Sequence, residues 1–378
     1  MYTGTKGGNS MIPISKPMIS AEDIKAVTRV LKSGMIAAGP AVKKFEEKFA
    51  SYTGVKQAVA VSNGTAALHA ALYGIGVRKG DRVVVPSFTF IASANAVLQA
   101  GGVPVFADIR ENTMNMDPDK LEEILMKDDK GRIKAVMPVH LYGRVCEMDK
   151  IMKIARKHGA MIIEDAAQAH GAKYRGKMAG SFGDAAGFSM YATKNMTTGE
   201  GGMVTTNTKE ASKIIRSFIN HGSEGVYHHT REGYNYRMTD AEAAMGITQL
   251  KRLDYFNRRR RKNAARYGKI LNKYGWLILP DAEKDEYHVY HQYTVRVKRG
   301  LRDRLASFLR ENGIGAKVFY PVPVHMQPLY KKSGIKKAKL PVAEKAAAEV
   351  LSLPAHPGLT PLDFIKIESV FRKFNGRI

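Results

Sequence analysis

The sequence predicts an α/β protein: a large domain built on a mostly parallel sheet flanked by helices, followed by a smaller α+β domain at the C-terminus. The chain has 378 residues, more than one ordinary hydrophobic core holds, and 44% of them are hydrophobic. Between residues 24 and 250, strand-like apolar runs at 82–86, 103–106 and 135–139 alternate with helical stretches. Such alternation favours parallel strands joined by crossover helices.

The domains are expected to divide near residue 250, with a large domain over 11–250 and a small one over 251–378. A run of five cations, 258–262, falls in a helical pattern just after this point, and a strand-rich segment over 290–297 follows. Five cations in a row could bind nucleic acid, but on a helix they project over more than one face. We therefore expect a solvated linker helix there.

The first strand, expected over 58–61, leads into small and polar residues and then into an alanine-rich helix. Gly64 would let an anion approach the backbone, and the first helical turn would present free N–H groups at the positive end of the helix dipole. This pattern predicts a phosphate cradle. An ordinary helix N-cap at Ser62 or Asn63 is the alternative interpretation.

A second motif is the apolar run 161–163 followed by Glu164 and Asp165, which is typical of a buried strand ending in acids. Ligands bind at such strand ends in parallel sheets. A carboxylate there can hold a protonated pyridine nitrogen and keep the ring electron-withdrawing. Asp165 is the candidate for this role, and capping of the next turn is the alternative.

The third motif surrounds Lys194, which lies shortly before the glycine-rich run 199–202. A lysine that forms a Schiff base must be held among apolar groups, so that its amine loses the proton at working pH. Phe188, Met190 and Tyr191 could supply these surroundings. A solvated surface lysine is the alternative, because lysine is seldom buried.

In this order and with these wide spacings, the three motifs resemble the fold type I pyridoxal-phosphate enzymes. The chain is more closely similar to the DegT/DnrJ/EryC1/StrS sugar aminotransferases, from about residue 12 to the C-terminus. The resemblance is carried by six segments in the family's order: 33–40, 62–68, 86–90, 164–168, the Lys194 loop and 233–238.

The resemblance implies pyridoxal 5'-phosphate as cofactor, with Lys194 bonded to its aldehyde and Asp165 paired with its pyridine nitrogen. Considered without the family, Phe90 would be a core aromatic and Gln168 a solvated helix residue. The other contacts implied are Phe90 stacked on the ring, Gln168 facing the phenolic oxygen, Gly64, Thr65 and Ser189 holding the phosphate, and Asn235 reaching it from the second subunit of a homodimer.

The implied reaction is a ping-pong transamination. An amino acid, expected to be L-glutamate, gives its amine to the cofactor, and the keto group of a nucleotide-linked sugar then takes it, as in amino-sugar and surface-polysaccharide biosynthesis. Lys194 would shuttle the proton as general acid and base. The family also contains dehydratases with histidine at this place, so a lysine favours amine transfer.

The sequence says less about which sugar is the substrate. The segment 227–231, which ends in Arg231, resembles that of relatives that aminate a 3-keto sugar. Some of these sugars bear a uronate carboxylate, with which an arginine can pair. The 197–202 loop has the form shared with 4-keto enzymes, and Met35 stands where many relatives carry tryptophan. The ketone position stays open, with a lean to carbon 3. Three further substrate contacts are expected: Arg237 on a phosphate group, and Tyr320 and His325 closing over the nucleotide sugar.

The formal charge of +25 exceeds what a diphosphate needs. A basic nucleic-acid-binding or regulatory protein on the same scaffold is therefore a competing class, and an acidic membrane surface is another possible partner. Because the cations are spread along the chain and no nucleic-acid module is visible, we expect neither partner.

Several other features are expected to be absent. One cysteine, Cys146, excludes an intramolecular disulfide, and no histidine spacing fits a metal motif, so no metal is expected. Residues 1–10 are polar and glycine-rich, which predicts a disordered leader. No apolar run reaches the length of a membrane helix, so a cytoplasmic enzyme is expected.

Overall fold

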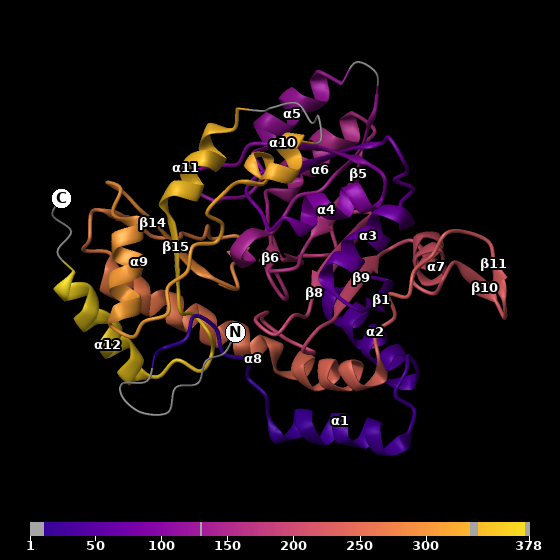
Figure 1. The fold of residues 1–378 in the computed structure, drawn as a ribbon, viewed down its shortest axis with the longest axis horizontal. Coiled ribbons are helices and arrows are strands. Elements are labelled where there is room, and N and C mark those ends of the chain that lie inside the picture. The colour runs from indigo at the N-terminus through magenta and orange to yellow at the C-terminus, as the bar shows by residue number, and fades with distance from the viewer. Residues whose placement is uncertain (1–10, 129–130, 333–338, 375–378) are drawn as a thin grey trace.

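The computed structural model describes residues 11–128, 131–332 and 339–374. The leader expected over 1–10 lies outside these residues. A seven-stranded sheet forms the centre of the large domain (Figure 1). Its strands are β1 (Gln57–Val61), β2 (Arg82–Pro86), β3 (Val103–Ala107), β4 (Ile133–Val136), β5 (Met161–Asp165), β8 (Ala185–Ser189) and β9 (Gly202–Thr206).

The strand order is β1-β9-β8-β5-β4-β2-β3. Strand β9 runs antiparallel to its neighbours β1 and β8, whereas the pairs from β8 across to β3 are parallel. The mostly parallel sheet expected from the sequence is confirmed. In the β5–β8 pair, Asp165 lies opposite Gly187, so both strands end at the same edge of the sheet.

Helices cover both faces of this sheet, which explains why its strands are apolar along nearly their whole length. In β2, Val83 and Val85 face one cluster and Val84 the other, as the two-residue period of a strand requires. The first face packs against α3 (Gly64–Gly74), α4 (Ala92–Gln99) and α7 (Lys209–Phe218). The second packs against α2 (Pro40–Thr53), α5 (Pro118–Met126), α6 (Met148–Lys157) and α8 (Asp240–Leu271).

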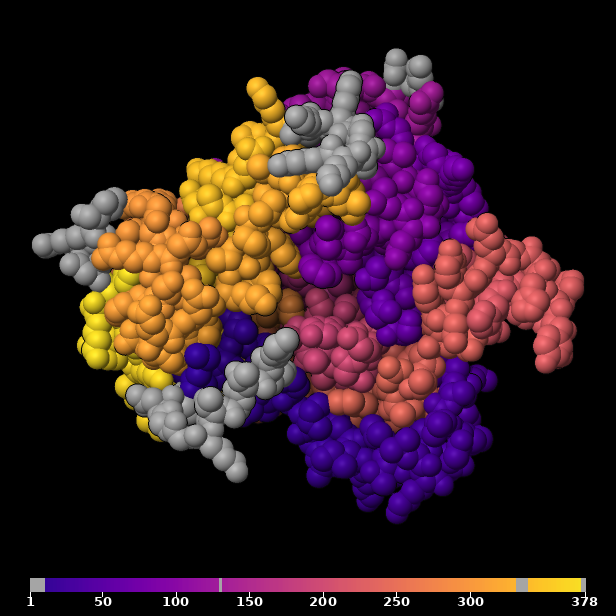
Figure 2. Space-filling model, in the orientation of Figure 1, coloured from indigo at the N-terminus to yellow at the C-terminus, as the bar shows by residue number. Residues whose placement is uncertain are grey.

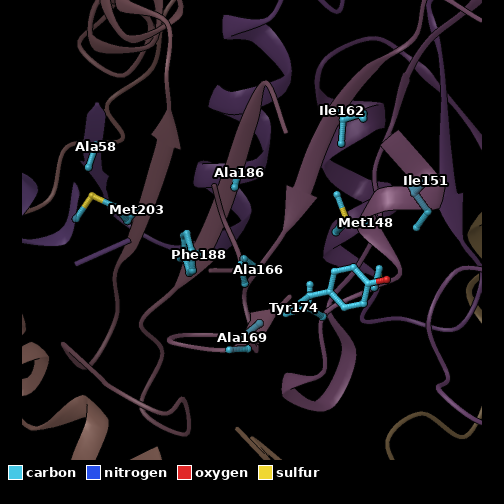
Figure 3. Close-up of a cluster of buried hydrophobic side chains, with 14 of the residues drawn as sticks. Ala58, Met148, Ile151, Ile162, Ala166, Ala169, Tyr174, Ala186, Phe188 and Met203 are labelled. Atoms are coloured by element: carbon cyan, nitrogen blue, oxygen red, sulfur yellow. The ribbon is translucent and has the colours of Figure 1, made fainter. Parts of the chain in front are cut away.

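Figure 3 shows part of the core on the second face. Ile162 of β5 and Phe188 of β8 lie in one layer with Met203 of β9, beside Met148 and Ile151 of α6. All five side chains are at most 1% exposed. This core fixes the ends of β5 and β8, where the motifs of interest lie.

Helix α8 has 32 residues and runs from the large domain into the small one (Figure 1). Thr239 caps its N-terminus in a capping box with Glu242. The expected domain boundary, between residues 250 and 251, therefore falls inside one continuous helix. Helix α1 (Ala21–Ser33) lies along α8, held by Asp23, which accepts a hydrogen bond from Gln249 at 3.0 Å.

The expectation of a solvated helix at the run of cations, 258–262, is wrong for Arg260, while Arg259 and Arg261 are partly exposed. Arg260 is 4% exposed and donates from Nη1 to the carbonyl of His291 at 3.0 Å. Arg261 and Arg259 donate to the carbonyls of His288 and Leu359, at 3.0 and 3.1 Å. Because guanidinium groups present several donors, these arginines join α8 to the backbone of the small domain.

The small domain packs on the second half of α8, with Tyr267 and Leu271 in its core. It contains a three-stranded antiparallel sheet, in the order β12-β14-β15, covered by α9 and α12. The bounds are β12 (Leu277–Ile278), β14 (Tyr293–Val297), β15 (Val350–Leu353), α9 (Arg302–Glu311) and α12 (Pro361–Lys373).

Short elements complete the described chain. The hairpin of β10 and β11 projects from the body of the molecule, as the coral region of Figure 2 shows. None of the helices described is both long and apolar enough to cross a membrane. The remaining bounds are β6 (Lys173–Tyr174), β7 (Lys177–Met178), β10 (Ser223–Gly225), β11 (His228–His229), β13 (Glu286–Tyr287), α10 (Pro328–Lys332), α11 (Pro341–Glu349), η1 (Leu141–Gly143) and η2 (Val324–Met326).

Candidate active site

The predicted motifs converge at the carboxyl edge of the large sheet. Asp165 ends β5 and Ser189 ends β8, while Gly64 begins the helix that follows β1. Phe90 lies in the loop between β2 and α4. Carboxyl ends of parallel strands form the usual ligand-binding edge of an α/β sheet, so the fold places these four residues where the sequence predicted a site.

Asp165 is a buried carboxylate, 5% exposed. It accepts hydrogen bonds from the Ser93 hydroxyl at 2.7 Å and from the backbone N–H of Ala167 at 3.1 Å. The second bond is the turn cap considered as the alternative role, so Asp165 does cap the turn. Burial raises the pKa of this carboxyl, and no Lys, Arg or His lies within ion-pair distance of it among the described residues. A buried carboxylate without a cation is suited to a cationic ligand.

Glu164 fixes the end of β5 from the other side of the strand. It is fully buried and accepts three backbone N–H groups from the turn 180–183, at 2.7 to 2.8 Å. His140 Nε2 lies 2.9 Å from the same carboxylate, and His140 Nδ1 accepts from the N–H of Cys146. The Nε2 of His140 is therefore the donor, and the satisfied carboxylate anchors the strand that carries Asp165.

Lys194 lies in the turn after β8, where its N–H donates to the carbonyl of Tyr191 at 2.9 Å. Burial lowers the pKa of its amine to about 8, although the negative charge of Asp165 acts in the opposite direction. Phe188 and Met190 are buried as expected. Tyr191 is 47% exposed, and its place beside the lysine side chain stays a prediction. An amine with this pKa is partly unprotonated near neutral pH.

At the predicted phosphate cradle, Gly64 packs closely against Ser189. Asn63 caps α3 by accepting from the N–H of Ala66 at 2.9 Å, so the capping alternative is also present. A Cβ added to Gly64 would lie 2.6 Å from the Cβ of Ser189, closer than real Cβ atoms approach. Gly64 and Ser189 thus face each other at the start of α3, beside Thr65, where the helix leaves free N–H groups for an anion.

Gln168, Tyr320 and Phe90 form one side of the site. Gln168 accepts the N–H of Tyr142 at 2.8 Å and donates from Nε2 to the Tyr320 hydroxyl at 3.1 Å. The rings of Phe90 and Tyr320 are tilted at 35°, with centroids 5.9 Å apart. Burial raises the pKa of the Tyr320 phenol, so it stays neutral. Phe90 is 55% exposed, which leaves a ring face free to stack.

Three other predicted contacts, Arg231, Asn235 and Arg237, lie on the segment between α7 and α8. Arg237 pairs through its backbone with Val61, at the end of β1 beside the cradle, and donates to Asn220 at 2.6 Å. Arg231 forms an ion pair with Glu224 of the projecting hairpin. Asn235 is exposed and pairs with Asn220, so neither it nor Arg231 makes a described hydrogen bond or ion pair to Lys194 or Asp165.

His325 contacts one residue of the large sheet's edge and one of α11. Its Nδ1 lies 2.5 Å from the hydroxyl of Ser87, which follows β2, and its Nε2 lies 3.4 Å from Glu344. These contacts join the segment after Tyr320 to the loop that carries Phe90. Within the described ranges, no group of three or more His, Cys, Asp or Glu side chains is arranged to hold a metal ion.

Ser93 is the partner of Asp165 that sequence reasoning missed. It lies at the start of α4, three residues after Phe90, and its hydroxyl also lies 3.0 Å from that of Thr89. Its bond to Asp165 joins residues 72 positions apart. The only local signal is a hydroxyl-rich stretch, 87–93, after a predicted strand.

The chain matches the DegT/DnrJ/EryC1/StrS aminotransferase family over residues 17–372, and it belongs to this family. The solved structure of S. venezuelae DesV is similar to it, with a TM-score of 0.89 and 40% identity over 95% of each chain. The fold is therefore that of an aminotransferase, as the sequence predicted.

Three curated relatives show the range of names among similar proteins. A "pleiotropic regulatory protein" of Geobacillus stearothermophilus is 42% identical, covering 90% of this chain and 91% of the relative. A GDP-perosamine synthase of Caulobacter vibrioides is 40% identical, covering 94% and 96%. A dTDP-3-amino-3,4,6-trideoxy-alpha-D-glucose transaminase of Streptomyces venezuelae is 39% identical, covering 95% and 94%.

The protein is a pyridoxal-phosphate-dependent aminotransferase, and its own residues fit that cofactor. The buried carboxylate of Asp165, which forms no ion pair with the described residues, suits a protonated ring nitrogen. The approach of Gly64 to Ser189 leaves no room for a side chain at the start of α3, where a phosphate would bind. The low-pKa amine of Lys194 suits an aldehyde.

Proposed function

We propose that the protein is a cytoplasmic homodimer that transfers the amino group of L-glutamate to the keto group of a nucleotide-linked sugar, for amino-sugar and polysaccharide biosynthesis. The observation that carries this proposal is the buried carboxylate of Asp165 at the end of β5, with Lys194 in the turn that follows the neighbouring strand β8. The names of the two sugar-related relatives support the substrate class.

Lys194 would be the group that moves the proton. Bound pyridoxal phosphate would supply an electrophilic aldehyde and a ring that withdraws electrons. With a pKa of about 8, the Nζ of Lys194 can both take a proton from the substrate carbon and return it near neutral pH, so one residue serves as base and acid. Lysine at its ordinary pKa would remain protonated and could not act as the base.

The surrounding residues would orient the ring. Asp165 would hold the ring nitrogen, because its carboxylate has no other cationic partner in the part of the chain described. Ser93 keeps that carboxylate aimed by its 2.7 Å bond. Gln168 would face the phenolic oxygen, since the N–H of Tyr142 and the hydroxyl of Tyr320 already fix both ends of its amide. Phe90 would stack on the ring with its exposed face.

Gly64, Thr65 and Ser189 would hold the phosphate, with Asn235 contributed by the second subunit. Support for a dimer comes from the exposure of Asn235, which lies on a segment that follows the projecting hairpin. Arg237, whose backbone pairs with the end of β1, would bind a phosphate group at the same edge. A two-fold assembly would give two equivalent sites.

For the sugar, we propose a 3-keto substrate, with a 4-keto substrate as the alternative. Arg231 is the candidate partner of a uronate carboxylate, and it already pairs with a carboxylate, Glu224. The substrate would have to displace Glu224, which a second carboxylate of similar geometry can do. Tyr320 and His325 would close over the nucleotide sugar from the small-domain side.

The relative named as a regulatory protein keeps the regulatory class as a second candidate. Assays of the purified protein with L-glutamate and a panel of 3-keto and 4-keto nucleotide sugars decide between them. We expect an amino sugar and 2-oxoglutarate in equal amounts, with a 3-keto compound preferred. Protein that carries the cofactor and yet turns over no member of the panel would argue for the regulatory role.

A further inference from the structure

A buried group of amide and imidazole side chains lies behind the Lys194 turn. Asn195, the residue after the lysine, is 3% exposed, although it is polar. Its Nδ2 donates to the Oδ1 of Asn257 at 2.8 Å and to the carbonyl of Val289 at 3.3 Å. Its Oδ1 lies 3.1 Å from the Nδ1 of His291. Every polar atom of this side chain therefore has a partner from a distant part of the chain.

Asn257 connects this group to α8 and to the turn after Asp165. It is fully buried, and its Nδ2 donates to the carbonyl of His170 at 2.8 Å. Gly171 follows with φ +77°, and a Cβ there would lie 2.7 Å from the same Nδ2. A side chain at position 171 would thus push Asn257 away, which shows that the chain is built to let this amide approach.

His291 and Val289 bring in the small domain, because they lie in the segment that leads into β14. Arg260 of α8 holds this segment, donating to the carbonyl of His291 at 3.0 Å and of Tyr290 at 3.4 Å. His291 is 7% exposed. Three segments, the lysine turn, α8 and the 288–292 segment, are therefore joined through one buried network, and a satisfied network of this kind is rigid.

The charges around Lys194 decide how the network is protonated. The groups facing the amine are Asp165 from β5, His170 from the following turn and His291 from the small domain, and Arg260 faces the two histidines. Burial lowers the pKa of His170 to about 3 and that of His291 well below its ordinary value, and the charge of Lys194 lowers both further. Both imidazoles are therefore neutral, and His291 donates from Nδ1–H to the Oδ1 of Asn195.

We propose that Asn195, Asn257 and His291 form a clamp that holds the turn carrying Lys194, so that the seating of the small domain sets the reactivity of the lysine. These are positioning residues, since they act through Lys194. The inference rests on the proposed role of Lys194 in the function above. If the clamp loosens, water reaches the amine and solvates its charged form. The pKa of the amine then rises, because burial no longer disfavours the charge.

The test uses pyridoxal phosphate alone, added to the full-length protein after its cofactor has been removed. The rate of covalent capture is followed by absorbance across about pH 6 to 10. Its pH dependence gives the midpoint, the pH at which half of the Lys194 amine is protonated. His291→Leu removes the donor to Asn195, whereas His291→Asn keeps an N–H near the Nδ1 position. We expect His291→Leu to raise the midpoint by about one pH unit and to slow capture near pH 7 about tenfold, and His291→Asn to remain within about twofold of the parent.

His356→Leu is the matched control, because His356 is also a buried histidine near Arg260, with its pKa lowered by burial to about 4. It makes no described contact with Asn195, so only its melting temperature should change. If His291→Leu does not fold, Asn257→Ser takes its place in the test, and we expect the same rise in the midpoint of capture. Folded His291→Leu or Asn257→Ser with the parent's midpoint and rate would overturn the clamp. The test uses no sugar and no amino donor. Its result therefore stays valid even if the protein does not carry out the proposed transamination.

Discussion

The hydroxyl of Ser93 donates to the carboxylate of Asp165 across 2.7 Å, linking the start of α4 to the end of β5. The bond lowers the pKa of a carboxyl that burial raises. It therefore favours the charged form of Asp165, which is the form that holds a protonated ring nitrogen. The bond thereby attaches the loop that carries Phe90 to Asp165. Phe90 is predicted to stack on the cofactor ring, and Asp165 is predicted to hold the ring nitrogen.

Ser93→Ala should weaken the enzyme without unfolding it. A hydrogen bond to a charged group contributes about 1.5 to 3 kcal/mol, so we expect a loss of roughly tenfold to a hundredfold in kcat or in cofactor affinity. Ser212→Ala is the matched control, because Ser212 is a serine 3% exposed on α7, away from the site. Equal kinetics for both variants would remove Ser93 from the site.

Lys194→Ala should give a folded protein that has no transaminase turnover and no absorbance band from covalently held cofactor. The reason is that no other lysine lies beside Asp165 in the described chain. Lys177→Ala, which changes an exposed lysine, is the comparison and should behave like the parent. Measurable turnover in the Lys194 variant would take the lysine out of this role.

The capture of pyridoxal phosphate by the cofactor-free protein should depend on pH through Lys194. Its pKa is lowered to about 8, so the amine is protonated and unreactive below that value and free above it. The rate should rise about tenfold per unit at lower pH and level off above about pH 8. Asp165→Asn removes the charge that raises this pKa, so the midpoint should move to lower pH. A midpoint near the ordinary lysine value would contradict the burial of the amine.

The sequence was informative where a feature depends on neighbours in the chain. The run 82–86 is β2, Asp165 ends β5, and Gly64 begins the helix after β1, as the sequence predicted. It was less informative where a feature depends on distant segments. Nothing near Ser93 reveals that β5 lies beside it, and the cations at 258–262 gave no sign that carbonyls of the small domain would receive Arg260.

Gly64→Ala tests the phosphate cradle. The added methyl would lie 2.6 Å from the Cβ of Ser189, so the start of α3 or the end of β8 must move apart. We expect the Kd for pyridoxal phosphate to rise about tenfold or more, because backbone N–H groups would lose their aim at the anion. Gly268→Ala, within α8 and with no atom near the added methyl, is the matched control and should leave that Kd unchanged. Similar Kd values for the two variants would place the phosphate elsewhere.

Arg231→Glu tests the substrate contact and the lean to a uronate-bearing 3-keto sugar. In the structure Arg231 pairs with Glu224, so the variant places two carboxylates together and repels a third on the substrate. The KM for a uronate-bearing substrate should rise about tenfold or more, while a matched sugar without the carboxylate should change little, because only the first presents a charge to position 231. Glu224→Gln is the converse control: it frees Arg231 and should lower the same KM. An unchanged KM for the uronate substrate in the Arg231→Glu variant would show that this arginine serves the hairpin through Glu224 and does not contact the sugar.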